Sequence, residues 1–378
     1  MINSIKDQEI VLKRSDFIIS PFLKRSNTVA AWQILSTFIP ICILWLIINK
    51  ICHSSIPIGI KGVELIPILT LLILLSSRSF SLMHDCGHGS LFESAWLNRL
   101  VAFPLGVLNA IPQYNWSRDH AFHHQHNGNW EIYKGPIDVI TLRDYKEMTL
   151  KERAFYKLSR HWTMLFPGGF YYLIIKPRIT LIIGLIKFSG YFIKQFKKLT
   201  SKRIFQLSSY KYIISKYRSE YWISSKEFYE MLANNIVVVT LWILMSRWMG
   251  TGTFWSLYSI IMTFSAAIFI CVFFVQHNFE GSYANGTSDW DLTKGAIDGS
   301  SNLDIPRWLD WFLADISFHS IHHLCERIPN YNLRACHNRN KHLLSNSKFL
   351  KIKDIPSCFK YIIWDSDSNS LTNSSDIM

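Results

Sequence analysis

The sequence predicts an all-α membrane protein with about four transmembrane helices and a cytoplasmic helical cap that holds a metal site. Composition is one reason: 49% of the 378 residues are hydrophobic and 15% are aromatic, with a mean hydropathy of +0.12. This is more apolar than an ordinary soluble enzyme and more polar than a protein that lies wholly within lipid. The other reasons are four apolar segments of bilayer-spanning length and three histidine clusters outside those segments.

The first two spans follow a charged N-terminal arm. Residues 1–28 are polar and basic, and we expect them on the cytoplasmic side of the membrane. The first predicted span covers residues 29–48, which carry no charge and have Trp32 and Trp45 near their ends, as in an aromatic belt. The second predicted span covers residues 62–83 and returns the chain to the cytoplasmic face.

Two charged residues lie within the second predicted span. Glu64 is near one end and Arg78 near the other, and we expect both side chains to reach the membrane interfaces by snorkelling. Residues 97–112 are apolar but too short to cross a bilayer, and Pro104 and Gly106 interrupt them. We therefore expect an interfacial or re-entrant segment that carries the chain from the first histidine cluster to the second.

The middle of the chain is predicted to be cytoplasmic, apart from one apolar stretch. Residues 113–160 are polar and aromatic. Residues 162–193 are apolar in two pieces, broken at residues 168–169 and 176–178, and either lie on the membrane or dip into it. Nine lysines and arginines within residues 194–226 mark that segment as cytoplasmic. The formal charge of the chain is +13, and its basic residues flank the apolar segments, as the positive-inside rule predicts. Membrane topology therefore accounts for the charge, and no nucleic-acid partner is inferred.

Two further spans are predicted at residues 231–249 and 254–275, joined by a tight turn at residues 250–252. Four spans put both termini in the cytosol and place His277 at the cytoplasmic mouth of the last span. Residues 278–365 then form a second cytoplasmic segment that contains the third histidine cluster.

The chain is therefore expected to divide into three parts: the arm of residues 1–28, a membrane domain of residues 29–345 and a polar tail of residues 346–378. The tail is rich in Ser, Asn and Asp from Asp365 onward, and this composition predicts disorder.

Ten of the 14 histidines belong to the three clusters or to His277, which indicates metal binding, because imidazole is the commonest protein ligand for borderline transition metals. An H-x-x-H-H pattern occurs twice, at residues 120–124 and 319–323. Residues three and four apart share one face of a helix, so the histidines of one pattern are expected to point at one spot. The predicted topology brings all the clusters to the same side of the membrane. The candidate ligands are His84, His88, His120, His123, His124, His277, His319, His322 and His323.

So many imidazoles exceed the needs of one ion, and a two-metal site with four or five histidines per metal fits their number. Imidazole suits iron, copper and zinc alike. Iron is favoured because a ligand shell made only of nitrogen atoms, at a membrane surface, suits activation of O₂ beside a lipid. Acidic residues near the clusters are expected to accept hydrogen bonds from the second ring nitrogens. The candidates for this role are Asp85, Asp119, Glu280, Asp315 and Glu326.

Several motifs resemble those of the integral-membrane fatty acid desaturases of the acyl-lipid Δ12/ω-3 branch. Residues 84–90 read HDCGHGS, and residues 120–124 read HAFHH with GN at 128–129 and GPIDV at 135–139. Residues 275–280 read VQHNFE, and residues 322–333 read HHLCERIPNYNL. The run from Arg327 to Leu333 is specific to this branch and lies outside any metal-ligand argument. The resemblance covers roughly residues 30–345.

The resemblance implies a membrane-bound acyl-lipid desaturase that uses O₂ and two electrons to introduce a cis double bond, Δ12-like in position, into a fatty acyl chain. It implies that the nine candidate histidines are the catalytic ligands of two iron ions. His126 lies outside the family pattern, and Phe273 occupies a position where a related branch has an Asn ligand. No His-Pro-Gly-Gly haem motif is present, so a separate electron donor is implied, either ferredoxin or cytochrome b5. The expected location is a bacterial inner membrane or the endoplasmic reticulum, with the histidine boxes cytoplasmic.

Two alternatives stay open from the residues. A carotenoid ketolase or hydroxylase, or an alkane hydroxylase, shares such a histidine site and inserts oxygen instead of forming a double bond. A metal transporter is disfavoured, because transporters place their ligands within the spans and here the histidines lie outside them.

Overall fold

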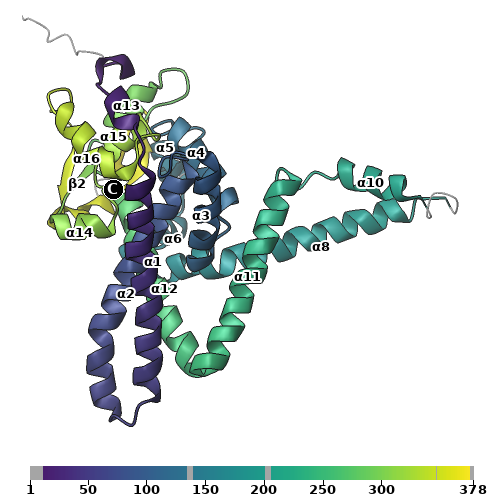
Figure 1. The fold of residues 1–378 in the computed structure, drawn as a ribbon. Helices are drawn as coiled ribbons and strands as arrows, with labels where there is room; N and C mark the ends of the chain where they lie inside the picture. The colour runs from purple at the N-terminus through teal and green to yellow at the C-terminus, as the bar shows by residue number, and fades with distance from the viewer. Residues whose placement is uncertain (1–11, 134–138, 201–205, 346, 375–378) are drawn as a thin grey trace, which may run out of the picture.

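Long apolar helices and a polar cap occupy opposite ends of the molecule (Figure 1). The computed structural model describes residues 12–133, 139–200, 206–345 and 347–374. Helices dominate this part of the chain, so the predicted all-α class is confirmed, with two small sheets added in the cap. Most of the GPIDV motif, residues 135–138, lies outside the described residues.

Two helical hairpins form the apolar end, and each of the four predicted spans lies within one of their helices. The helices of the second hairpin are joined by Gly250 alone, whose φ of +84° is open to glycine and costly for other residues. The hairpins are α1 (Asn27–His53) with α2 (Ile58–Gly87), and α11 (Ser225–Met249) with α12 (Thr251–Val275).

A fifth segment, Trp162–Phe196, is also long and apolar enough to cross a membrane. It runs through α7 (Leu165–Phe170), a π-helical turn (Tyr171–Ile175) and α8 (Lys176–Phe196). The expected breaks at residues 168–169 and 176–178 are wrong, because the backbone stays helical through both. Gly169 instead provides close packing, since a Cβ there would lie 2.7 Å from the Cβ of Ala266 on α12. In Figure 1, α8 runs away from the other long helices and transverse to α1 and α2, with α10 (Leu207–Lys216) beside it.

The short apolar segment between the first two histidine clusters is α3 (Ala95–Leu108), which packs against α2. A reversal at Ala110, whose φ is +54°, leads into α4 (Gln113–Gln125). Polar side chains satisfy the carbonyls of this reversal: partly buried Arg178 donates to Ala110 O at 2.6 Å, and buried Asn234 donates to Ile111 O at 3.0 Å. The α3–α4 pair therefore forms a reversal held by α8 and α11.

The cap consists of short helices and five short strands. Parallel pairing joins β1 to β4 and β2 to β3, and antiparallel pairing joins β4 to β5. The helices are α5 (Leu142–Glu147), α6 (Leu150–Ser159), α13 (Leu292–Ile297), α14 (Arg307–Phe312), α15 (His319–Leu324), α16 (Asn330–Arg339) and α17 (Ile355–Cys358). The strands are β1 (Ile140–Thr141), β2 (Asn302–Asp304), β3 (Phe349–Lys351), β4 (Tyr361–Asp365) and β5 (Ser370–Asn373). Single 3₁₀ turns lie at Arg14–Asp16, Ser20–Leu23, Trp162–Met164 and Ile352–Asp354.

The predicted disorder from Asp365 onward is wrong for residues 365–374. Their Ser- and Asp-rich run forms the turn of the β4–β5 hairpin, in which Trp364 pairs with Leu371. Leu371 is buried, and Trp364 Nε1 donates to Ala284 O at 3.2 Å, so the hairpin is packed on the cap. Turn residues there mark a reversal between two strands, which composition does not distinguish from disorder.

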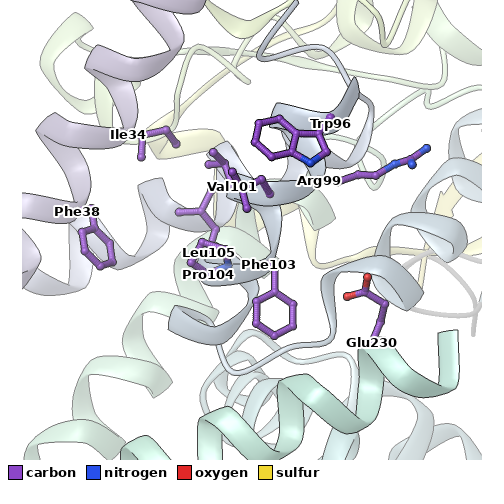
Figure 2. A pocket seen from close by; sticks show the side chains of 10 residues that line it. Ile34, Phe38, Trp96, Arg99, Val101, Phe103, Pro104, Leu105 and Glu230 are labelled. Atoms are coloured by element: carbon purple, nitrogen blue, oxygen red, sulfur yellow. The ribbon is translucent and has the colours of Figure 1, made fainter. Parts of the chain in front are cut away.

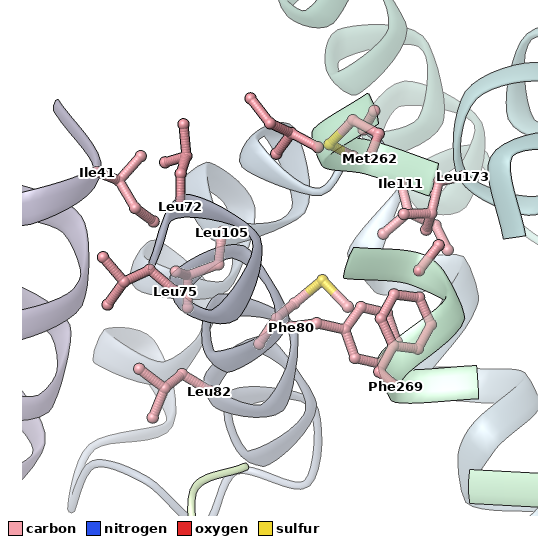
Figure 3. Close-up of a cluster of buried hydrophobic side chains, with 14 of the residues drawn as sticks. Ile41, Leu72, Leu75, Phe80, Leu82, Leu105, Ile111, Leu173, Met262 and Phe269 are labelled. Carbon is pink, nitrogen blue, oxygen red and sulfur yellow. The ribbon is translucent and has the colours of Figure 1, made fainter. Parts of the chain in front are cut away.

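A hydrophobic cluster joins α1, α2, α3 and α12 below the cap (Figure 3). Phe80 and Phe269 stack in it with ring centroids 3.7 Å apart. Arg78 does not snorkel as expected: it is buried, donates to Thr37 Oγ1 at 3.0 Å and to Trp311 O, and lies over the Trp311 ring. The guanidinium therefore ties two membrane helices to α14 of the cap.

Candidate metal centre

All nine histidines proposed as ligands meet at the boundary between the membrane helices and the cap. They come from four places in the chain: the C-terminal end of α2, helix α4, the residue pair after α12, and helix α15. The structure divides them into two adjoining groups of ring nitrogens. The five-histidine group comprises His84, His88, His120, His124 and His322, and the four-histidine group comprises His123, His277, His319 and His323.

Short separations between Nε2 atoms define each group. In the five-histidine group His84 lies 3.3 Å from His88 and 3.1 Å from His322, and His124 lies 3.1 Å from His322 and 3.0 Å from His120. In the four-histidine group His277 Nε2 lies 3.1 Å from His123 Nε2 and 3.0 Å from His319 Nε2. The ligand atoms of His323 lie within 4.8 Å of those of His123 and His277.

The expectation that one H-x-x-H-H pattern points at one spot is wrong, because each pattern serves both groups. In α4 the i, i+4 pair His120 and His124 joins the five-histidine group, whereas His123 joins the other. In α15 the arrangement is reversed, and His322 leaves its two neighbours for the five-histidine group. Successive residues of a helix point about 100° apart, so two adjacent histidines can join different groups. The repeated pattern therefore contributes side chains to both groups.

The nitrogen geometry fits bound cations. A ring nitrogen either carries a hydrogen or a lone pair, so Nε2 of His322 cannot make two good hydrogen bonds to two other Nε2 atoms. Both ring nitrogens of His323 are buried and have no hydrogen-bond partner among the described residues. Nitrogens about 2.1 Å from a common ion lie about 3.0 Å apart at a right angle, close to the separations seen here. The donor set thus fits transition-metal binding by imidazole.

Two of the five acidic residues proposed to orient the histidines do contact them. Asp85 Oδ1 accepts from His84 Nδ1 at 3.0 Å, and Glu326 Oε2 lies 3.8 Å from His124 Nδ1 and 4.0 Å from His88 Nδ1. The other three form ion pairs with basic residues instead: Asp119 with Arg118, Glu280 with Lys348, and Asp315 with Arg334.

Sequence reasoning missed two backbone groups that hold ligand side chains. The carbonyl of Gly299 lies 3.1 Å from His277 Nδ1. The N–H of Asn330 donates to Asp85 Oδ2 at 3.0 Å, so Asp85 links α16 to His84. Asn330 belongs to the run 327–333, for whose distinctive pattern the sequence offers no structural reason. The position of Asn330 supplies one, because its N–H holds the Asp85 carboxylate, which in turn holds the candidate ligand His84.

Aromatic rings cover the membrane side of both groups. Phe273 has its centroid 5.7 Å from those of His84 and His120 and 6.1 Å from that of His319, so it contacts both groups. Trp116 stacks on His120 with centroids 4.6 Å apart. Phe273 supplies no ligand atom, and both rings instead place apolar surface against the histidine groups.

The other histidines lie outside both groups. His126 hydrogen bonds through Nδ1 to Phe122 O at 2.9 Å, and its ring stacks on Trp290. The remaining histidines outside the groups are His53, His161, His337 and His342.

Burial keeps the clustered imidazoles in the neutral form that binds metal. Removal from water lowers the pKa of His277 to about 4, although its bond to Gly299 O acts in the opposite direction. Burial, together with the neighbouring histidines, also holds the pKa values of His123, His124, His322 and His323 well below the ordinary value. The rings are therefore ready to coordinate metal at neutral pH.

We expect the metal-free protein to lose stability as the pH falls from 6.5 to 5. The unfolded chain takes up protons on histidine near pH 6.5, whereas folded His277 takes one up only near pH 4. The unfolded state thus binds more protons in this window, and one such histidine costs about 2 kcal/mol at pH 5. Thermal unfolding of chelator-treated protein in detergent at a series of pH values measures this, with His53→Gln, at an exposed position, as the control. An unfolding temperature independent of pH would contradict the expectation.

Replacing Asp85 with asparagine is expected to weaken metal binding by about 10- to 100-fold. The amide cannot accept from both His84 Nδ1 and the Asn330 N–H as the carboxylate does. Iron retained after dialysis against graded chelator concentrations measures the effect. Asp119→Asn is the matched control, since Asp119 is an exposed residue that pairs with Arg118. Equal retention by the two variants would show that Asp85 does not support the site.

Comparisons with known proteins agree with this arrangement. Residues 64–350 match the sequence profile described as fatty acid desaturase. The chain is 25% identical over 343 residues to a protein named fatty acid desaturase from Bacillus subtilis, covering 90% of this chain and 84% of that one. It is 24% identical to an sn-1 oleoyl-lipid 12-desaturase from Synechocystis sp., over 68% of this chain and 63% of the relative. It is also 26% identical to an sn-1 acyl-lipid omega-3 desaturase (ferredoxin) from Nostoc sp., over 67% of this chain and 61% of the relative.

Proposed function

Because this chain belongs to the fatty acid desaturase family, its activity is the oxidative desaturation of a fatty acyl chain, and we propose that it acts on membrane acyl lipids as a Δ12-like enzyme. The observation that carries the proposal is the pair of adjoining histidine groups beneath an apolar aromatic cover. Desaturation of two adjacent methylenes breaks two C–H bonds and forms one C=C bond. The two hydrogens removed from the acyl chain supply two of the four electrons and two of the four protons that reduce O₂ to two waters. The electron donor and the solvent supply the other two electrons and two protons.

We propose that the five- and four-histidine groups each hold one iron ion. Imidazole suits several metals, but zinc has no redox chemistry, and an unactivated C–H bond requires an oxidant. Two bound irons would supply the site's ability to activate O₂. Asp85 and the Gly299 carbonyl support this proposal, because each hydrogen bonds a ligand ring through Nδ1 and thereby directs its Nε2 toward the group.

The chain's own residues position the acyl chain and exclude water. Phe273 touches both histidine groups, and Phe80 lies behind it with ring centroids 6.2 Å apart. We propose that methylenes of the substrate lie against Phe273 and Trp116, which offer apolar contacts and no proton donor to the reacting carbons. The C–C bond that is oxidised is then the one that Phe273 and Trp116 place beside the two histidine groups.

The protein is integral to the membrane, and we propose that its histidine groups and both termini face the cytosol. The basic N-terminal arm and the basic segment around α10 support this orientation by the positive-inside rule. The oxygen-inserting alternative is not favoured, because the family profile and the relatives named here are all desaturases.

We propose that a separate acidic one-electron carrier, such as a ferredoxin or cytochrome b5, docks over Glu326. The side chain of Glu326 is 41% exposed, yet it lies within 4.0 Å of two ligand rings, so it marks a short route from the surface to the five-histidine group. Arg14 and Arg327 act electrostatically on Glu326 and provide positive charge for an acidic partner.

A fatty acid profile with double-bond positions tests the activity. Cells that express this chain with a compatible electron donor are expected to contain new unsaturated acyl chains in their membrane lipids. Cells that express His124→Ala at equal membrane levels are expected to lack them. Hydroxylated or keto products would instead support the oxygen-inserting alternative, and unchanged lipids with altered cellular metal would support transport.

A further inference from the structure

An open groove of about 680 Å³ lies between α1, α3 and α11, on the outer side of the re-entrant helix (Figure 2). Its lining differs from end to end. Figure 2 shows the side chains of Ile34 and Phe38 at one end and those of Arg99 and Glu230 at the other. A groove that is apolar at one end and charged at the other fits an amphiphile, and its size is that of a typical ligand site.

The two charges of the groove have no partner of their own. Neither Arg99 nor Glu230 forms an ion pair or a hydrogen bond through its side chain with another described residue. Glu230 is half-buried in the second turn of α11, where a carboxylate gains from a cationic partner. By contrast, Glu227 on the preceding turn is paired with Arg118. Arg99 and Glu230 therefore offer one positive and one negative site to a ligand.

The charged end lies where lipid headgroups are expected. Trp96 borders it and is 65% exposed, and tryptophan prefers the membrane–water interface. Arg99 and Glu230 each stand within the first two turns of their helices, α3 and α11. Ile34 and Phe38 lie further into α1, so the apolar end points into the hydrocarbon region.

We propose that this groove binds a zwitterionic glycerophospholipid as the acyl substrate, with its phosphate on Arg99 and its ammonium group on Glu230. The inference rests on the proposed function, since the lipid is taken to be the substrate of that activity. The planar guanidinium suits a phosphate, and a carboxylate suits an ammonium group. An anionic phospholipid without an ammonium group would leave Glu230 facing like charge, and a neutral diacylglycerol would leave both charges unpaired.

The groove also borders the hydrophobic cluster that packs beside the candidate metal centre. Leu105 forms part of its wall and belongs to the hydrophobic cluster that contains Phe80 (Figure 3). Phe80 in turn lies beside Phe273, which contacts both histidine groups. Packed apolar side chains thus link the lining of the groove to Phe273 at the histidine groups.

The test uses the full-length protein in nanodiscs of phosphatidylethanolamine or of phosphatidylglycerol, with an electron donor. Desaturated product is measured for each lipid, and lipid binding is measured separately from the immobilised fraction of a spin-labelled phosphatidylethanolamine. Wild type is expected to prefer phosphatidylethanolamine by about tenfold, the worth of one charge-assisted hydrogen bond. Arg99→Gln is expected to lose about tenfold in binding and rate on phosphatidylethanolamine, and Glu230→Gln to remove most of the preference. Arg247→Gln and Glu64→Gln, at exposed positions distant from the groove lining, are the matched controls and are expected to behave as wild type.

Unchanged binding and preference in both groove variants would overturn the proposal, as would equal use of the two lipids by wild type. If Arg99→Gln does not fold, Arg99→Lys takes its place and is expected to keep binding while losing part of the affinity for phosphate. Failure of the proposed function gives a different result: spin-label binding still depends on Arg99 and Glu230, but wild type forms no desaturated product.

Discussion

His124→Ala is expected to abolish desaturation and to remove about half of the bound iron, because it empties the five-histidine group. His123→Ala, at the adjacent residue, is expected to have the same effect by emptying the four-histidine group. His124 belongs to the five-histidine group and His123 to the four-histidine group, although the two residues are neighbours in α4. Loss of one ligand from a buried imidazole shell should cost at least the 10- to 100-fold that loss of an outer hydrogen bond costs. Each single variant should therefore retain close to one iron per chain, and the double variant almost none.

Iron per chain, measured by elemental analysis of protein purified in detergent, separates these outcomes, and product formation is measured on the same samples. His126→Ala is the control on the same segment, because His126 contacts Phe122 and Trp290 and belongs to neither group. If His123→Ala and His124→Ala both lose all iron, the two groups fill cooperatively as one site. If His126→Ala loses iron, the assignment of His120, His123 and His124 as the iron ligands of this segment is wrong.

Replacing Gly87 with alanine is expected to lower activity by roughly tenfold or more and to reduce iron in the five-histidine group. Gly87 lies between His84 and His88, and a Cβ there would overlap Ser117 Oγ and lie 3.2 Å from Ser117 Cβ on α4. The added methyl group would force α2 away from α4, and both helices carry ligands of that group. Displacements of about 1 Å in a catalytic constellation are enough to cost about 100-fold.

A second substitution tests this explanation. Ser117→Gly removes the side chain that the new methyl would meet, so the double variant is expected to regain much of the lost iron and activity. Gly190→Ala is the control, because a methyl group added to that helical glycine would have nothing within 4 Å and alanine favours a helix by about 1 kcal/mol. Failure of Ser117→Gly to restore Gly87→Ala would show that the loss has another cause than contact between α2 and α4.

The sequence was sufficient for features that depend on composition or on short spacing. Four apolar stretches of bilayer length became helices, because length and hydropathy alone decide whether a segment can lie in lipid. The nine histidines were recognisable as candidate ligands because their residue type and clustering are unusual. The apolar stretch at residues 97–112 was recognisably too short to cross a bilayer, and it forms the 14-residue helix α3 followed by a reversal at Ala110.

Predictions from local sequence pattern were wrong where a residue finds its contacts on a segment that is distant in the chain. Arg78 was expected to reach water, but Thr37 and Trp311 offer it a buried oxygen shell and an aromatic face. The Ser- and Asp-rich run after Asp365 was expected to be disordered, yet residues 370–373 pair with β4. Both errors have one cause, because hydropathy and composition describe a residue's neighbours in the chain and not those in space.

The sequence by itself therefore determined which histidines are candidate ligands, which segments can enter lipid, and the family to which the chain belongs. Only the tertiary structure decided how these histidines divide between two groups, since His84 and His322 are 238 residues apart and meet only when α2 and α15 pack together. It also decided that Asn330 secures Asp85, and that Arg99 and Glu230 share one groove. The physical reason is range: a helix sets the direction of a side chain within one turn, but which other side chain it meets depends on the packing of whole helices.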